Sequence, residues 1–188
     1  MKIITATLDK LSELSGISIA FEVTAELVFT KDNSGCYNTT LRALDRPYLK
    51  DYDAIPGNKP EDWLRQFDTR NWGLILAKEG DEVAGACLLA WKSPGVDMLE
   101  GRDDLAVLWD LRVDPLRRGK GIGTKLFKAA TDWARSHGAT ELKIETQNNN
   151  VQAVKFYQKQ GCRLMKVIPG AYPDFPDEAM LLFYVSVS

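Results

Sequence analysis

The stretch Arg117-Arg118-Gly119-Lys120-Gly121-Ile122-Gly123 joins two segments of different periodicity and constrains the fold more than any other part of the chain. Before it, residues 105–113 carry apolar side chains at alternate positions, which predicts a strand with Asp110 and Arg112 on its less apolar face. After it, apolar residues recur at helical spacing, which predicts a helix that ends near Gly138. The chain must therefore contain a strand and a helix joined by a short glycine-rich turn.

This turn has the composition of an anion-binding site. Its glycines allow a tight turn with exposed N–H groups, the helix start carries partial positive charge, and Arg117, Arg118 and Lys120 add full charges. Two common phosphate loops are excluded, because no Gly-Lys pair precedes Ser or Thr and Thr124 occupies a required glycine position. The remaining pattern is Arg118-x-x-Gly121-x-Gly123, which by itself also fits a plain turn with solvated basic residues.

A second pattern follows. Residues 141–146 predict a strand, 147–150 a polar loop, and 151–160 a helix that Gly161 ends. The loop and helix carry the spacing Asn150-x-x-Ala153-x-x-x-Tyr157-x-x-x-Gly161.

In this order and spacing, the two patterns resemble the motifs [QR]-x-x-G-x-[GA] and N-x-x-A-x-x-x-Y-x-x-x-G-F of the GNAT N-acetyltransferases. Cys162 replaces the usual aromatic residue, a departure that concerns packing rather than chemistry. The resemblance covers nearly the whole chain and implies the α/β GNAT fold, with a central mixed, mostly antiparallel twisted sheet of about six to seven strands flanked by about four helices. The length of 188 residues agrees with a single domain over residues 1–188.

The rest of the chain is less regular. Residues 17–29 are ambiguous between strand and loop, Asp32–Gly35 predicts a turn, and a helix is expected from Thr39 toward Pro47. Residues 72–78 and 82–91 predict a hairpin.

Charge is distributed unevenly along the chain. Residues 1–110 carry 12 Lys and Arg against 19 Asp and Glu, a net −7, whereas residues 111–188 carry 12 against 7, a net +5. An anionic cofactor and a cationic second substrate would match this asymmetry, and solvated surface charge would explain it as well. No basic stripe with interleaved aromatic residues suggests a nucleic-acid partner.

Location and metal content are also constrained. No apolar run reaches the ~18 residues of a membrane span, and the N-terminus lacks a signal-peptide pattern, so we expect a cytoplasmic protein that does not bind membranes. Cys36, Cys87 and Cys162 are scattered and the chain has one His, which argues against a disulfide framework or a metal site.

The resemblance also suggests catalytic roles. Acetyl transfer to an amine requires loss of a proton from the ammonium group and stabilisation of the departing CoA thiolate. The family places a tyrosine hydroxyl near the thioester sulfur at the position of Tyr157, so Tyr157 is the expected acid, and a core aromatic residue is the alternative. Asp110 is the best-placed carboxylate for the base, unless it is a structural partner of Arg112. Glu22 is its rival, and a water chain can replace both.

Acetyl-CoA is the implied co-substrate, with no metal. We expect its pyrophosphate at the glycine-rich loop and the reaction oxyanion at a backbone N–H near Leu111, where the family's strand is distorted. Asn150 is expected either to contact the pantetheine arm or to cap its helix. The expected cofactor-binding residues are Leu111, Arg112, Val113, Arg118, Gly119, Lys120, Gly121, Ile122, Gly123, Thr124, Asn150 and Tyr157.

Within the family, the stretches Phe21–Thr24, Arg46–Tyr52 and Leu108–Val113 are similar to streptothricin N-acetyltransferases. This similarity implies acetylation of the antibiotic's β-lysine part, a cationic acceptor. A polyamine, an aminoglycoside, and a protein N-terminus or lysine stay open as acceptors, and so does an acyl-CoA-binding sensor without turnover. A homodimer is compatible with such folds, although nothing in the chain establishes one.

Overall fold

The computed structural model describes residues 1–33 and 37–188, which form two compact units. Unit 1 comprises Met1–Ala20, Asp51–Ile144 and Val185–Ser188, and unit 2 comprises Phe21–Lys50 and Glu145–Tyr184. Cys36 and part of the turn expected at Asp32–Gly35 lie outside the described residues. The single domain over residues 1–188 stays a prediction.

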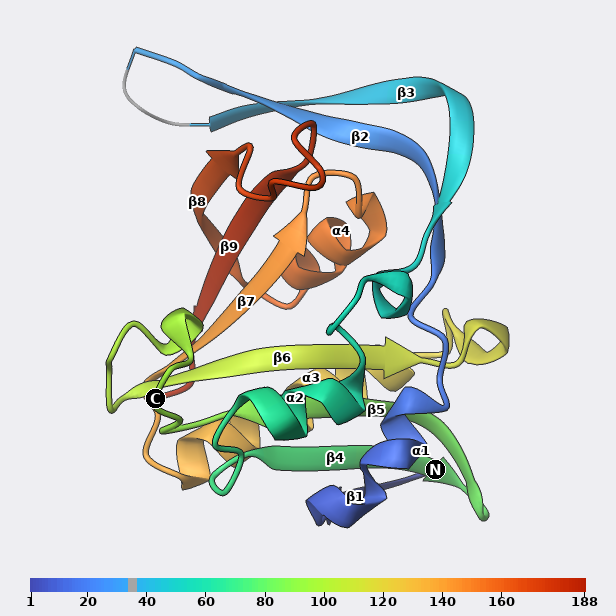
Figure 1. Ribbon diagram of the computed structural model, residues 1–188, viewed down its shortest axis with the longest axis vertical. Coiled ribbons are helices and arrows are strands. Elements are labelled where there is room, and N and C mark those ends of the chain that lie inside the picture. Colours follow the sequence, from blue (N-terminus) through green and yellow to red (C-terminus); the bar gives the residue numbers. More distant parts are fainter. Residues whose placement is uncertain (34–36) are drawn as a thin grey trace. The chain divides into compact units, whose positions relative to one another are not determined.

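Figure 1 shows the strands and helices in chain order. The strands are β1 (Lys2–Ala6), β2 (Phe21–Lys31), β3 (Tyr37–Lys50), β4 (Gly73–Glu79), β5 (Glu82–Ala90), β6 (Leu105–Val113), β7 (Glu141–Gln147), β8 (Arg163–Pro169) and β9 (Ala179–Ser186). The helices are α1 (Leu11–Ser15), α2 (Pro60–Gln66), α3 (Ile122–Ser136) and α4 (Val151–Lys159). Within the described ranges, no helix is long and apolar enough to cross a membrane.

Hydrogen bonds join seven strands into one sheet in the order β1-β4-β5-β6-β7-β9-β8. β6 and β7 pair in parallel, whereas the β1–β4, β4–β5, β5–β6 and β8–β9 pairs are antiparallel. In unit 1, α1 contacts β5, and α3 packs on β4, β5 and β6 (Figure 1). The predicted hairpin, the strand before the glycine-rich turn and the helix after it are all confirmed.

The core of unit 1 is apolar and rich in aromatic rings. Helix α2 buries Trp63, while Leu64 of the same helix is 40% exposed. Trp109 of β6 lies 6.1 Å from Trp63, 5.2 Å from Phe67 and 5.1 Å from Trp72, measured between ring centroids. This packing holds the centre of β6 against α2 and the segment that joins α2 to β4.

Strand β6 contains a bulge at Trp109. Leu108 pairs with Leu89 and Asp110 with Leu88, so one extra β6 residue lies between two consecutive β5 partners. A bulge of this kind bends the strand and changes the faces on which later side chains lie.

Because of the bulge, the side chains after Trp109 lie on the opposite faces of the sheet from those that the sequence pattern predicts. Asp110 and Arg112 stand opposite β5 residues of the core beneath α1 and α2 and are themselves buried. Leu111 instead stands opposite Cys87, whose Sγ lies 3.9 Å from the carbonyl oxygen of Leu126 in α3. Placing all the alternate apolar residues of 105–113 on one face was therefore wrong beyond Trp109.

In unit 2, β2 and β3 form a long two-stranded antiparallel ribbon. The helix expected from Thr39 toward Pro47 is wrong, because that segment belongs to β3 and pairs with β2. The ambiguous stretch before it becomes strand from Phe21. Tertiary pairing decides both segments, since most β3 side chains are exposed and give no buried periodicity.

Candidate active site

The glycine-rich loop lies in unit 1 and leads directly into α3. Asp114 caps the preceding turn, because its Oδ1 accepts the N–H of Leu116 at 3.0 Å. Gly119 (φ 79°) and Gly121 (φ 78°) then adopt left-handed backbone conformations that glycine favours. Gly121 is the N-cap of α3 and has no side chain that could cap this helix start, where backbone N–H groups and the helix dipole favour an anion. The local geometry suits an anion, as predicted for this loop.

The basic residues of the loop have different partners. The Arg117 guanidinium is paired with Glu79, Glu82 and Asp114, and the hydrogen bond to Glu82 is the main reason that its pKa is raised. These carboxylates neutralise a charge that the sequence had suggested for the anion.

Arg118 is directed at the backbone. Its Nε donates to the carbonyl oxygen of Val113 at 3.1 Å, and its Nη2 lies 3.4 Å from those of Ser18 and Ala20. The exposed Lys120 makes no hydrogen bond or ion pair with the described residues. Among the described residues, carboxylates therefore pair with Arg117, whereas Arg118 contacts backbone carbonyls and Lys120 makes no such contact.

Asp110 and Arg112 form the centre of a buried ion-pair network in unit 1. Arg112 has no exposed side-chain surface, and its Nη2 lies 2.8 Å from Oδ2 of Asp110. Its Nε lies 3.1 and 3.0 Å from the two carboxylate oxygens. Burial raises the pKa of Asp110, while the adjacent guanidinium opposes that shift.

Two further groups complete the shell of this guanidinium. Asp53 accepts from Nη1 at 2.6 Å and from Nη2 at 2.9 Å, and the carbonyl oxygen of Ile17 accepts from Nη1 at 3.1 Å. The five N–H donors of Arg112 therefore all have acceptors. This is the structural pairing of Asp110 with Arg112 that the sequence left as an alternative, and a role as base stays a prediction.

In unit 2, two residues of the sequence Asn148-Asn149-Asn150 hold the chain between β7 and α4. Asn150 caps α4, because its Oδ1 accepts the N–H of Ala153 at 3.1 Å. Asn148 is hydrogen-bonded to Leu27 in β2 and to Ala179 in β9. These bonds fix the loop between β7 and α4. The capping alternative for Asn150 is realised, and its contact with a cofactor stays a prediction.

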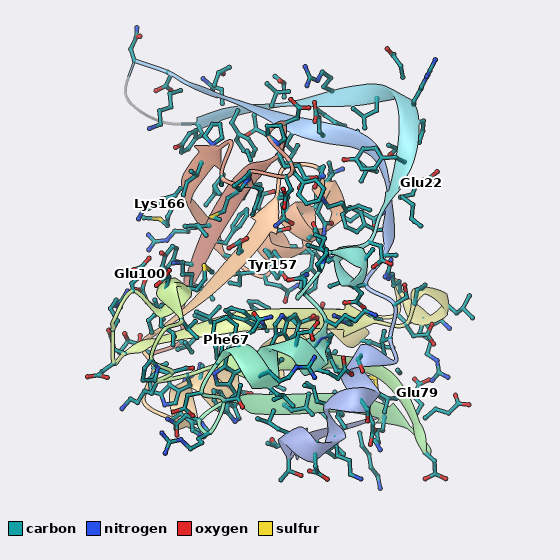
Figure 2. All side chains as sticks on the ribbon, in the orientation of Figure 1. Glu22, Phe67, Glu79, Glu100, Tyr157 and Lys166 are labelled. Atoms are coloured by element: carbon teal, nitrogen blue, oxygen red, sulfur yellow. The ribbon has the colours of Figure 1, made fainter. Side chains whose placement is uncertain are left out.

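Tyr157 follows Asn150 by seven residues, which places it two turns along the same side of α4. It is 8% exposed and lies 6.2 Å from Phe183 between ring centroids. Figure 2 shows its ring inside unit 2. This burial agrees with a core aromatic residue and also with a hydroxyl kept away from bulk water, so its catalytic role stays a prediction.

Glu22 lies on the outer face of the ribbon (Figure 2). The register pairs it with Leu49, which is 71% exposed, whereas Phe21 is paired with Lys50, which is buried. Its side chain therefore points away from the buried face of unit 2, which gives no support to Glu22 as a base.

The sequence patterns did not predict a buried polar cluster in unit 2, formed by Lys50, Asn149 and Glu178. Lys50 donates to Glu178 at 2.6 Å, and Asn149 donates to the same oxygen at 3.0 Å. Nothing in the local pattern signals these residues, because they come from three distant parts of the chain.

A thiol nucleophile is disfavoured among the described residues. Cys87 and Cys162 are both buried, and burial raises the pKa of Cys162 to about 12 and also raises that of Cys87.

The sequence was compared with known families and proteins. A family model described as the acetyltransferase (GNAT) family matches residues 37–162. A streptothricin acetyltransferase from Streptomyces lavendulae is 25% identical over 143 residues, which are 76% of this chain and 71% of that protein.

Two solved structures match nearly the full chain. The crystal structure of nourseothricin acetyltransferase has a TM-score of 0.75 at 19% identity and covers 100% of this chain and 98% of its own. A Bacillus anthracis protein, described as a candidate streptothricin acetyltransferase and solved with acetyl coenzyme A, has a TM-score of 0.76 at 24% identity and covers 98% and 96%. At these identities the structures establish the fold alone. The expected mixed, mostly antiparallel sheet flanked by helices is confirmed.

Proposed function

The chain belongs to the GNAT acetyltransferase family, and we propose that it transfers the acetyl group of acetyl-CoA to a primary amine of streptothricin. The main support is the similarity to a streptothricin acetyltransferase over most of both chains. The loop of left-handed glycines at the uncapped start of α3 supports acetyl-CoA as the donor, because its pyrophosphate suits such a site.

The amine attacks the thioester carbonyl directly in this proposal. The nitrogen–carbon bond forms, the carbonyl becomes an oxyanion, and the carbon–sulfur bond then breaks to release CoA. Direct attack is favoured over an acyl-cysteine, because both described cysteines are buried with raised pKa values.

The oxyanion needs a fixed N–H donor. We assign it to the backbone of β6 close to the Trp109 bulge, where the extra residue disturbs regular pairing with β5. The sequence placed this donor near Leu111, two residues further along the strand.

Two proton transfers complete the reaction. The amine must lose a proton, and water is the acceptor best supported here, because Arg112 already engages both oxygens of Asp110. Tyr157 is assigned as the acid that protonates the CoA thiolate, from its position on α4 after the Asn150 cap.

Mass spectrometry of the reaction product tests this proposal. Purified protein with acetyl-CoA and streptothricin should yield the antibiotic carrying one added acetyl group on an amine of its β-lysine part. Acetylation of a different amine in a panel, with streptothricin unchanged, would contradict the acceptor and retain the enzyme class. CoA binding without acetylation of any amine would favour a sensor.

A further inference from the structure

The buried polar cluster of unit 2 brings together Tyr48, Lys50, Asn149, Phe175 and Glu178. The Lys50 ammonium is 2.6 Å from Oε1 of Glu178 and 3.3 Å from the centroid of the Phe175 ring. A carboxylate and an aromatic face thus already hold one primary ammonium group at this place. The cluster reaches the surface through Tyr48, which is 41% exposed.

The orientation of the Asn149 amide is determined by its neighbours. Its Nδ2 lies 3.0 Å from Oε1 of Glu178 and 3.0 Å from the hydroxyl of Tyr48. A carboxylate accepts hydrogen bonds and cannot donate when ionised, so the NH₂ group must face Glu178 and the carbonyl must face away.

This leaves the carbonyl oxygen of Asn149 without a partner. Oδ1 is buried and has no hydrogen bond within the described part of the chain, and the residue is 3% exposed. An unpaired buried acceptor destabilises the folded chain, because it has lost its hydrogen bond to water without gaining another. Such a group indicates a donor that arrives with a ligand.

The neighbouring groups indicate which kind of hydrogen-bond donor the ligand carries. Oδ1 of Asn149 can accept an N–H. Glu178 is nearly buried, and no described residue donates to its Oε2, so this carboxylate offers a second acceptor. A primary amine or ammonium has several N–H bonds, so it can donate to a carbonyl oxygen, and its charge also suits a carboxylate. An amide N–H of the pantetheine arm could satisfy Oδ1 but has no use for the carboxylate.

We propose that Asn149 and Glu178 form the subsite that binds an amino group of the cationic acceptor, with Tyr48 at its entrance. The proposal rests on the proposed function, since it names the residues that recognise the amine. These residues determine specificity for the acceptor and do not handle the acetyl group.

The test uses the full chain with Glu178→Gln as the main variant. Glutamine keeps an oxygen for Lys50 and Asn149 and removes the charge. Asp177→Asn is the matched control, because it removes the same charge at the neighbouring exposed position. Asn149→Leu removes the carbonyl as a second variant. Thermal melting confirms that each variant is folded.

Steady-state kinetics with streptothricin show whether the group that donates to Oδ1 of Asn149 is an amine of the acceptor or an amide of the pantetheine arm. We expect Glu178→Gln to raise the KM for the amine about tenfold or more, with acetyl-CoA affinity within about twofold of the parent, and Asp177→Asn to change neither. An unchanged KM in folded Glu178→Gln would overturn the proposal. A loss confined to acetyl-CoA affinity would also overturn it and assign the donor to the pantetheine arm.

Isothermal titration calorimetry measures binding of the amine at the subsite independently of acetyl transfer. Streptothricin and spermidine are titrated into the CoA-bound parent and into CoA-bound Glu178→Gln. If the parent is inactive, the proposed function fails, yet amine binding that Glu178→Gln weakens about tenfold still supports the subsite. Equal binding by both proteins, or no binding of either amine by the parent, contradicts the subsite.

Discussion

Gly121 has a backbone requirement and a chemical one. Its φ of 78° suits glycine, and a Cβ there would meet no atom within 4 Å. Replacement therefore strains the backbone without a steric clash, and the added group points into open space at the start of α3.

Replacing Gly121 by Asp should raise the Kd for acetyl-CoA by about tenfold or more, because a negative charge then stands at the proposed pyrophosphate site. Gly121→Asn is the control, since it has similar bulk, tolerates this φ and is neutral. Calorimetric titration with acetyl-CoA measures both. Equal losses in the two variants would mean that charge is not involved, and unchanged binding in Gly121→Asp would remove the loop from the cofactor site.

Tyr157→Phe keeps the ring that packs near Phe183 and removes only the hydroxyl. If that hydroxyl protonates the thiolate, kcat should fall roughly a hundredfold while acetyl-CoA affinity stays constant. Tyr184→Phe is the matched control, because Tyr157 and Tyr184 are both 8% exposed in unit 2. Similar kcat values for parent and Tyr157→Phe would leave Tyr157 as a packing residue.

At the scale of the element, the bulge of β6 and the Arg112 network belong together. Asp110 follows the bulge directly, and the acceptors around Arg112 come from β6, from the turn at Asp53 and from the end of α1 near Ile17. The network therefore ties the distorted strand to two segments that are distant in the chain.

Asp110→Asn should lower the free energy of unfolding by about 2–3 kcal/mol, because Arg112 stays buried with less compensating charge. Asp53→Asn should cost less, since the side chain of Asp53 is 22% exposed against 2% for Asp110. Urea unfolding at neutral pH measures the difference.

The kinetics of Asp110→Asn also examine the base. If water accepts the proton, the folded variant should retain most of its kcat and the parental pH–rate profile. A folded variant that loses activity together with one limb of that profile would restore Asp110 as the base.

Local patterns predicted those helices and strands in which buried apolar residues recur at regular spacing in the sequence. Strand β6 up to Trp109 and helix α3 were predicted because each carries a complete signal within a few residues, and the Asn150 cap of α4 was one of two alternatives for that residue. The reversal of β6 after Trp109 does not follow from the local pattern, since it depends on a bulge and on Asp53 across the fold; only the family resemblance suggested a distortion, near Leu111. The β3 error has the same origin, because its partner β2 decides its conformation.

The candidate site was predicted unevenly for the same reason. The glycine-rich loop is contiguous in sequence and was proposed as a cofactor site from its own residues, whereas the cluster of Lys50, Asn149 and Glu178 is assembled from separate segments and was missed.

For the whole molecule, ligand binding should appear as added stability. Acetyl-CoA at 100 times its Kd should raise the free energy of unfolding by about 2.7 kcal/mol, because it binds only the folded chain. Thermal melting with and without acetyl-CoA measures this shift, and at the same concentration a tenfold higher Kd in Gly121→Asp should reduce it to about 1.4 kcal/mol. An equal shift in that variant would place the cofactor elsewhere.

We propose that this chain acetylates a cationic amine, with streptothricin as the acceptor. Release of free CoA thiol measures this acetyl transfer directly, in parallel assays of acetyl-CoA with streptothricin, spermidine, kanamycin and a lysine-rich peptide. We expect saturable release of CoA thiol with streptothricin, at a kcat/KM well above that of the other amines. A preference for the peptide or another amine, or no release with streptothricin, would contradict it.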